Sequence, residues 1–140
     1  MRRFASFPPP LLREWPVPMR VVLAGLLPAG FGFLCGALLG SSGAVFLVLQ
    51  IIGVLGGFAA GFEHDHWRGG VLRGLCGGAL FGGFILIGHA VVGGSDHGLI
   101  PGVQAFQVLI TVFFGVLLGY LGAWCARAAT TSRAPRPAGP

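Results

Sequence analysis

The segment from Gly61 to Gly70, GFEHDHWRGG, holds the densest group of charged and metal-capable side chains in this chain. Glu63, His64 and His66 could together supply carboxylate and imidazole ligands to a metal ion. The paired cysteines or helical histidine pair of the recognised zinc patterns do not occur in the sequence. A turn between two membrane helices needs polar residues, an interfacial tryptophan and arginines against the headgroups, and the segment supplies all three. The sequence therefore predicts a turn here and no metal site.

Six other polar residues could do chemistry because they lie within strongly apolar segments or in the loop beside them. They are Gln50, His89, Asp96, His97, Gln107 and Thr111. Polar groups are costly to bury in lipid, so such residues are functional candidates by default, and a histidine can exchange a proton near neutral pH. One hypothesis is an outward-facing polar vestibule with His89 and Gln50 near its floor. The alternative is that these groups hydrogen-bond across helices or lie at the headgroups.

Catalytic signatures are missing from the sequence. It contains no nucleophile elbow, phosphate-binding loop, dinucleotide fingerprint or pair of catalytic carboxylates, and its apolar segments carry no Asp or Glu. The three cysteines are an odd number embedded in or beside apolar sequence, which argues against a disulfide scaffold. We therefore expect a protein that is not an enzyme and that uses no cofactor.

The elements that must position these residues follow from the composition. The chain has 140 residues, of which 54% are hydrophobic and 9% charged, whereas soluble domains carry about 25% charged residues. Four apolar windows each reach the roughly 20 residues that an α-helix needs to cross a bilayer, and only helices satisfy such backbones without water. The sequence predicts an all-α integral membrane protein, a bundle of four transmembrane helices at about 20–40, 43–62, 71–92 and 103–126. Residues 1–19 form a proline-rich N-terminal segment, and residues 127–140 a disordered tail.

The arginines predict how this bundle is oriented. The chain has nine arginines and no lysine, and with four spans all nine fall on one side: before the first span, at the middle connection and after the last span. By the positive-inside rule both termini are cytoplasmic, in a plasma membrane or bacterial inner membrane. Although the formal net charge is +5, no basic patch interleaved with aromatic residues is present, so we expect the lipid bilayer as a partner and no nucleic acid.

Glycine spacing is the clearest pattern within the spans. Many of the 26 glycines recur every four residues, and residues four apart share one helix face. Such Gly-xxx-Gly faces let helices approach closely, within the chain or between copies. The sequence IIGVLGGFAAGF at residues 51–62 also aligns with FFGVLLGYLGAW at 113–124, and one hypothesis is therefore a duplicated two-helix hairpin. The helix-packing glycines are Gly32, Gly36, Gly40, Gly53, Gly57, Gly61, Gly70, Gly74, Gly78, Gly82, Gly115 and Gly119.

Two functions compete on this basis. The favoured one is a non-catalytic multi-pass membrane protein, an assembly or interaction subunit that packs through its glycine faces as a homo-oligomer or against another membrane protein. The alternative is a small oligomeric channel or transporter that uses the outward-facing polar vestibule around His89 and Gln50. The first is favoured because glycine faces are abundant and no charged group lines a path across the membrane.

Overall fold

Helices make up most of the described part of the chain, which in the computed structural model comprises residues 15–39, 42–64, 66–92 and 104–131. The first span consists of α1 (Val17–Val21), a π-helical turn η2 (Val22–Leu26) and α2 (Leu27–Leu38). The other spans are α3 (Gly43–Gly61), α4 (Trp67–Val92) and α5 (Gln104–Thr131). Four helices are long and apolar enough to cross a membrane, and no strand occurs in these ranges. The prediction of an all-helical fold with four helices long and apolar enough to cross a membrane is confirmed in these ranges.

The largest differences from the predicted helix boundaries occur at three places. The first helix begins at Val17, inside the proline-rich segment predicted to precede the first span, because Pro18 lies in the first turn, where its missing N–H costs no hydrogen bond. The third span begins at Trp67 rather than 71, and the backbone N–H groups of Gly69 and Gly70 both donate to the His66 carbonyl. The last helix continues past 126 to Thr131, through alanines that favour helix.

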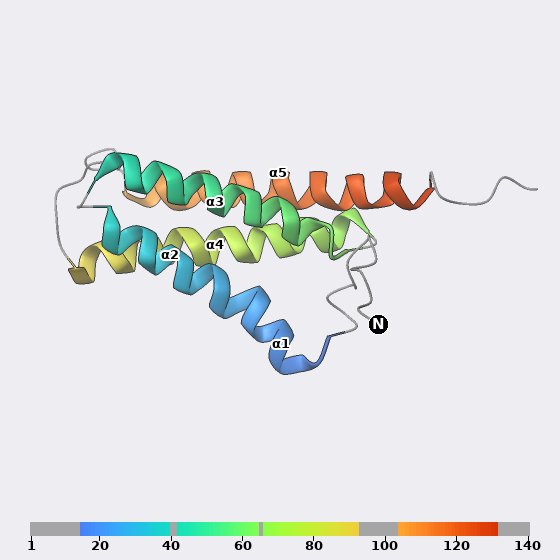
Figure 1. The fold of residues 1–140 in the computed structure, drawn as a ribbon, viewed down its shortest axis with the longest axis horizontal. Coiled ribbons are helices and arrows are strands. Elements are labelled where there is room, and N and C mark those ends of the chain that lie inside the picture. The colour runs from blue at the N-terminus through green and yellow to red at the C-terminus, as the bar shows by residue number, and fades with distance from the viewer. Residues whose placement is uncertain (1–14, 40–41, 65, 93–103, 132–140) are drawn as a thin grey trace, which may run out of the picture.

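Helix α4 is the centre of the bundle (Figure 1). It packs along α2 on one side and along α5 on the other, while α3 lies over α5 and α4. Figure 1 also shows α1 leaning away from the bundle, whereas α2 runs close beside α4. The start of α1, the α3–α4 connection and the end of α5 lie at the same end of the molecule, which we call the connection end. Arg20, Arg68, Arg73 and Arg127 all belong to this end, whose cytoplasmic location remains a prediction.

Helices α4 and α5 run antiparallel and meet backbone to backbone. A β-carbon built on Gly74 would collide with the carbonyl oxygen of Gly115, and one on Gly115 would collide with the oxygen of Gly74. The same reciprocal contact joins Gly70 to Gly119, one turn away on each helix. Only a glycine hydrogen fits in these positions, and Cα–H groups there point at carbonyl oxygens across the contact. This contact therefore depends on the absence of side chains on both helices.

Helix α2 runs parallel to α4 and approaches it through a second set of glycines. A β-carbon on Gly32 would collide with the carbonyl oxygen of Phe81, and one on Gly36 with that of Ile85. From the other side, a β-carbon on Gly88 would collide with the oxygen of Phe33. Gly88 was not among the predicted packing glycines because it lies on the α2-facing side of α4, off the four-residue row that faces α5.

Helix α3 is held at its two ends and stands apart from the bundle between them. Near its start, Phe46 packs with Leu39 and Ile85 in the hydrophobic core. At its end, a β-carbon on Gly61 would lie 2.8 Å from the carbonyl oxygen of Gly119. The predicted packing glycines between these points face side chains, and a β-carbon on Gly57 would lie in ordinary contact, 3.7 Å from Cδ1 of Leu118. The middle of α3 therefore covers a cavity instead of a helix backbone.

Three further sequence predictions concern Gly40, Gly53 and the duplicated hairpin. Gly40 lies outside the described residues. The predicted packing glycine Gly53 faces two aromatic rings, with its β-carbon position 3.1 Å from Cζ of Phe81. The duplicated hairpin remains a prediction, although α3 and α5, the helices that carry the two similar segments, pack against each other.

Candidate functional site

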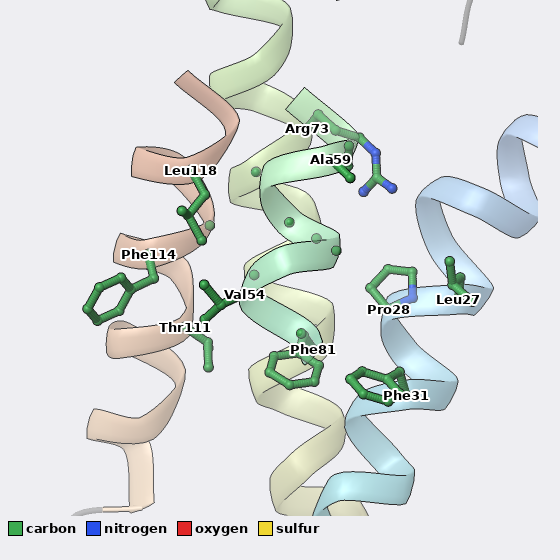
Figure 2. A pocket seen from close by; sticks show the side chains of 18 of the residues that line it. Leu27, Pro28, Phe31, Val54, Ala59, Arg73, Phe81, Thr111, Phe114 and Leu118 are labelled. Atoms are coloured by element: carbon green, nitrogen blue, oxygen red, sulfur yellow. The ribbon is translucent and has the colours of Figure 1, made fainter. Parts of the chain in front are cut away.

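A cavity of about 580 Å³ lies between the four spans. Its volume is in the range of small-molecule sites, which run from about 300 to 1,000 Å³. Figure 2 shows side chains reaching it from the first span, α3, α4 and α5, with Phe114 at one edge and Leu27 and Pro28 at the opposite one. The lining is mostly apolar, and the faces of α3 and α4 contribute glycines to it. Four polar side chains also line the cavity: Gln50, Glu63, Arg73 and Thr111.

Arg73 crosses from α4 to the backbone of the first span at the connection end of this cavity. Its Nη2 donates to the carbonyl oxygen of Leu23 at 2.6 Å, and its Nη1 donates to the carbonyl oxygen of Ala24 at 3.4 Å. The guanidinium is partly buried, and Figure 2 shows it extending from α4 towards the first span. The sequence identified this arginine only as a topology signal, whereas the structure gives it a bonding role between two spans.

Both carbonyls are available to Arg73 because of Pro28. In a regular helix Ala24 would accept from the N–H of residue 28, but proline has none. Leu23 would accept from the N–H of Leu27, which instead bonds to the Val22 carbonyl in the π-helical turn. A backbone carbonyl without a partner is costly in lipid, where no water replaces the lost bond. Arg73 therefore satisfies the two carbonyls that the proline and the π-helical turn release.

Glu63 follows the end of α3 and lines the same end of the cavity. Removal of the carboxylate from water raises the pKa of Glu63, while the nearby positive charge of Arg73 opposes that rise. Its Oε2 atom is buried and has no hydrogen-bond partner among the described residues. Burial therefore outweighs the arginine, and this carboxyl group holds a proton more strongly in the folded chain than in water.

The stability of the folded chain should consequently depend on pH through Glu63. Because the folded chain binds this proton more tightly than the unfolded chain, stability should rise as pH falls through the raised pKa of Glu63, and level off below its unfolded pKa. Unfolding midpoints in detergent, measured across that range, should shift upward on acidification in the wild type. Glu63→Gln, which cannot titrate, should lose that part of the profile. Parallel pH profiles for the two proteins would contradict this assignment.

Gln50 and Thr111 lie further from the connection end. The Nε2 atom of Gln50 is buried and has no hydrogen-bond partner in the described part of the chain. Thr111 is 8% exposed, and its hydroxyl donates to the Val108 carbonyl at 2.9 Å. This threonine also packs onto α4, where a β-carbon on Gly78 or Gly82 would collide with it. Thr111 therefore has both a hydrogen-bond partner and a packing role, whereas the amide nitrogen of Gln50 has no hydrogen-bond partner among the described residues.

The six predicted vestibule residues do not all come together. The cavity unites Gln50 with Thr111, but its lining includes neither His89 nor Gln107. His89 lies beside α2, with its backbone nitrogen 2.9 Å from the position of a β-carbon on Gly36. Asp96 and His97 lie outside the described residues. The polar vestibule thus remains a prediction, while the cavity that the structure contains reaches to the connection end.

The candidate metal ligands lie in the α3–α4 connection. His64 packs against α4, where a β-carbon on Gly69 would lie 2.6 Å from its Cδ2, and His66 is exposed. Within the described ranges, no group of three or more His, Cys, Asp or Glu side chains could hold a metal ion. The backbone N–H of Phe62 donates to Ala59, and that of His64 donates to Gly61, as in a tight turn after a helix.

No family model matches the chain, and no curated protein or solved structure matches it either. The geometry of the chain itself is therefore the basis for its function. That geometry consists of three helices in glycine contact, a fourth helix held at its ends, and a mostly apolar cavity between them that contains an arginine and a carboxyl group.

Proposed function

We propose that this chain is a small, non-catalytic multi-pass membrane protein that acts as an assembly or interaction subunit. Its orientation places both termini and the connection end at the cytoplasmic face of a plasma or bacterial inner membrane. The one-sided arginines support that orientation. The lack of any catalytic motif in the sequence supports a role in association rather than in chemistry.

The observation that carries this proposal is the uneven burial of the helices. Only 6% of the apolar window of α3 is buried, against 22% in each of the other three spans. Helices α2, α4 and α5 already meet through glycines, so they form one unit on which α3 is the least covered element. Val48, Ile51 and Leu55 are 56%, 52% and 62% exposed and recur at the three- and four-residue spacing that pairs helices. A second copy of this chain, packed symmetrically along α3, would cover this row.

Cysteine cross-linking tests that interface. In a background with Cys76 and Cys125 replaced by serine, oxidation of Leu55→Cys in native membranes should give a covalent dimer in several-fold higher yield than oxidation of Leu72→Cys. The control is matched, because Leu72 is 63% exposed on α4 and lies at a similar distance from the connection end. Equal yields from the two positions, or no dimer from either, would contradict assembly through α3.

A small oligomeric channel or transporter is the second candidate. The observation in its favour is that Gln50 and Thr111 line a cavity among the four spans. If the protein carries a solute or protons through its polar residues, Gln50→Leu and His89→Ala should abolish flux into liposomes. Flux that survives both changes would leave the assembly role as the better account of the bundle.

A further inference from the structure

Three polar atoms that belong to cavity-lining residues have no hydrogen-bond partner among the described residues. They are Oε2 of Glu63, Nε of Arg73 and Nε2 of Gln50, and all three are buried. Buried polar atoms in proteins are almost always paired, and the penalty for leaving them unpaired is largest where lipid surrounds the helices. The three atoms therefore describe which polar groups a bound molecule would need to carry.

The charges at the connection end favour an uncharged molecule. Arg73 and Glu63 carry opposite formal charges, and the Nη atoms of Arg73 already donate to the backbone of the first span. An anion would gain from Arg73 but would be repelled by an ionised Glu63, and it would have to lose its own hydration. A hydroxyl group can accept from an N–H and donate to a carboxylate, so one such group matches the chemistry of both side chains.

The remaining surface favours a long apolar body. Gln50 lies in α3 and Glu63 lies just after its end, at opposite ends of the segment that lines the cavity and about 20 Å apart at the helical rise of 1.5 Å per residue. Between them, Gly56 and Gly57 leave the face of α3 smooth, since a β-carbon on Gly56 would meet nothing within 4 Å and one on Gly57 would be in ordinary contact. The rings of Phe31 and Phe81 stack with centroids 5.9 Å apart and complete an apolar wall. At the far end, Gln50 supplies an amide N–H, which needs an acceptor oxygen.

We propose that the cavity binds an uncharged, single-chain amphiphile with a hydroxyl head at Arg73 and Glu63 and an acceptor oxygen near Gln50. Its hydrocarbon chain lies along the glycine face of α3. This ligand site is independent of the assembly role proposed above, because it involves the inner side of α3 and not its exposed row. If the protein binds the amphiphile but stays monomeric, the assembly proposal fails and the ligand site stands. If it forms a dimer but does not bind the amphiphile, the ligand site fails and the assembly proposal stands.

Binding of tritiated probes to the full chain in nanodiscs tests the site. The probes are hexadecanediol with a hydroxyl at each end, hexadecanol with one hydroxyl, and palmitate with a carboxylate. Gly57→Leu should abolish saturable binding, because a β-carbon there is tolerated and the rest of the side chain fills the cavity. Gly83→Leu is the matched control, since nothing lies within 4 Å of its β-carbon and the residue does not line the cavity. Saturable binding that is equal in both variants would overturn the proposal.

The order of the probes tests the chemistry. The diol should bind roughly 5-fold more tightly than hexadecanol in the wild type, the effect of about one hydrogen bond. Gln50→Leu should remove that difference and leave hexadecanol unaffected. Palmitate should bind roughly 10-fold more weakly than hexadecanol and should recover in Glu63→Gln, which removes the opposing charge. Palmitate as the tightest wild-type ligand, or a diol preference that survives Gln50→Leu, would show that the cavity does not select an uncharged hydroxylated molecule.

Discussion

Gly74→Leu is expected to lower the free energy of unfolding by at least about 3 kcal/mol, at the upper end of the cost of overpacking. The β-carbon would collide with the carbonyl oxygen of Gly115, and the nearest atoms are all backbone, so no side-chain rotation relieves the clash. Helices α4 and α5 would have to separate along their shared face, which also removes the contact between Gly70 and Gly119. Steric trapping or SDS titration in mixed micelles would measure the loss.

Gly83→Leu is the control for this prediction. It makes the same chemical change on the same helix, but nothing lies within 4 Å of its β-carbon. Since leucine favours helix over glycine, the control should be neutral or stabilising by up to about 1 kcal/mol. If the two variants unfold at the same SDS fraction, the glycine contact between α4 and α5 does not hold the bundle together.

Arg73→Leu is expected to destabilise the bundle by about 2–3 kcal/mol, although it removes a charge from a membrane span. An arginine at the centre of a span costs about 2.5–3.5 kcal/mol to insert, and each backbone carbonyl left unsatisfied in lipid costs several. The variant leaves the carbonyl oxygens of Leu23 and Ala24 without the hydrogen bonds that Arg73 donates. The cost of these two lost hydrogen bonds outweighs the gain from removing the charge. Arg68→Leu, a change at an exposed arginine near the start of α4, should have little effect.

A double-mutant cycle between Arg73 and Pro28 tests whether Arg73 acts through the carbonyls that the proline releases. Pro28→Ala restores an N–H that can bond to the Ala24 carbonyl and lets the π-helical turn relax to a regular helix. Arg73→Leu should therefore cost clearly less in the Pro28→Ala background than in the wild type, with a coupling energy of at least about 1 kcal/mol by SDS titration. Additive effects of the two changes would mean that Arg73 does not act through the carbonyls that the proline releases.

Much of the fold was predictable from hydropathy and length. The four spans were visible because each is a long run of apolar residues with few charges, and such a run pairs its backbone groups as a helix where no water can do so. The ends were less well predicted, because Pro18 fits a first turn and the alanines after 126 continue a helix beyond the apolar run. Such boundaries depend on local backbone bonding, which hydropathy does not report.

The candidate site was predictable only in its parts. Gln50 and Thr111 were singled out because polar groups are costly in lipid, and the structure brings both to one cavity. His89, which has the same signal, lies against α2 and outside that lining. Composition does not distinguish an intramembrane polar residue that faces the cavity from one that does not. The direction in which a side chain points depends on how its helix is rotated against its neighbours.

By itself, the sequence determined the class of this protein, its four apolar helices and the spacing of its glycines, since these depend on residue type and on the helical period. Tertiary structure alone decided that Gly74 meets Gly115, that Gly57 faces a cavity, and that Arg73 bonds to the turn before Pro28. Each of these arrangements brings together residues from different helices. Helices of similar apolar composition can pack in many registers, and only the fit of their three-dimensional surfaces selects one of them.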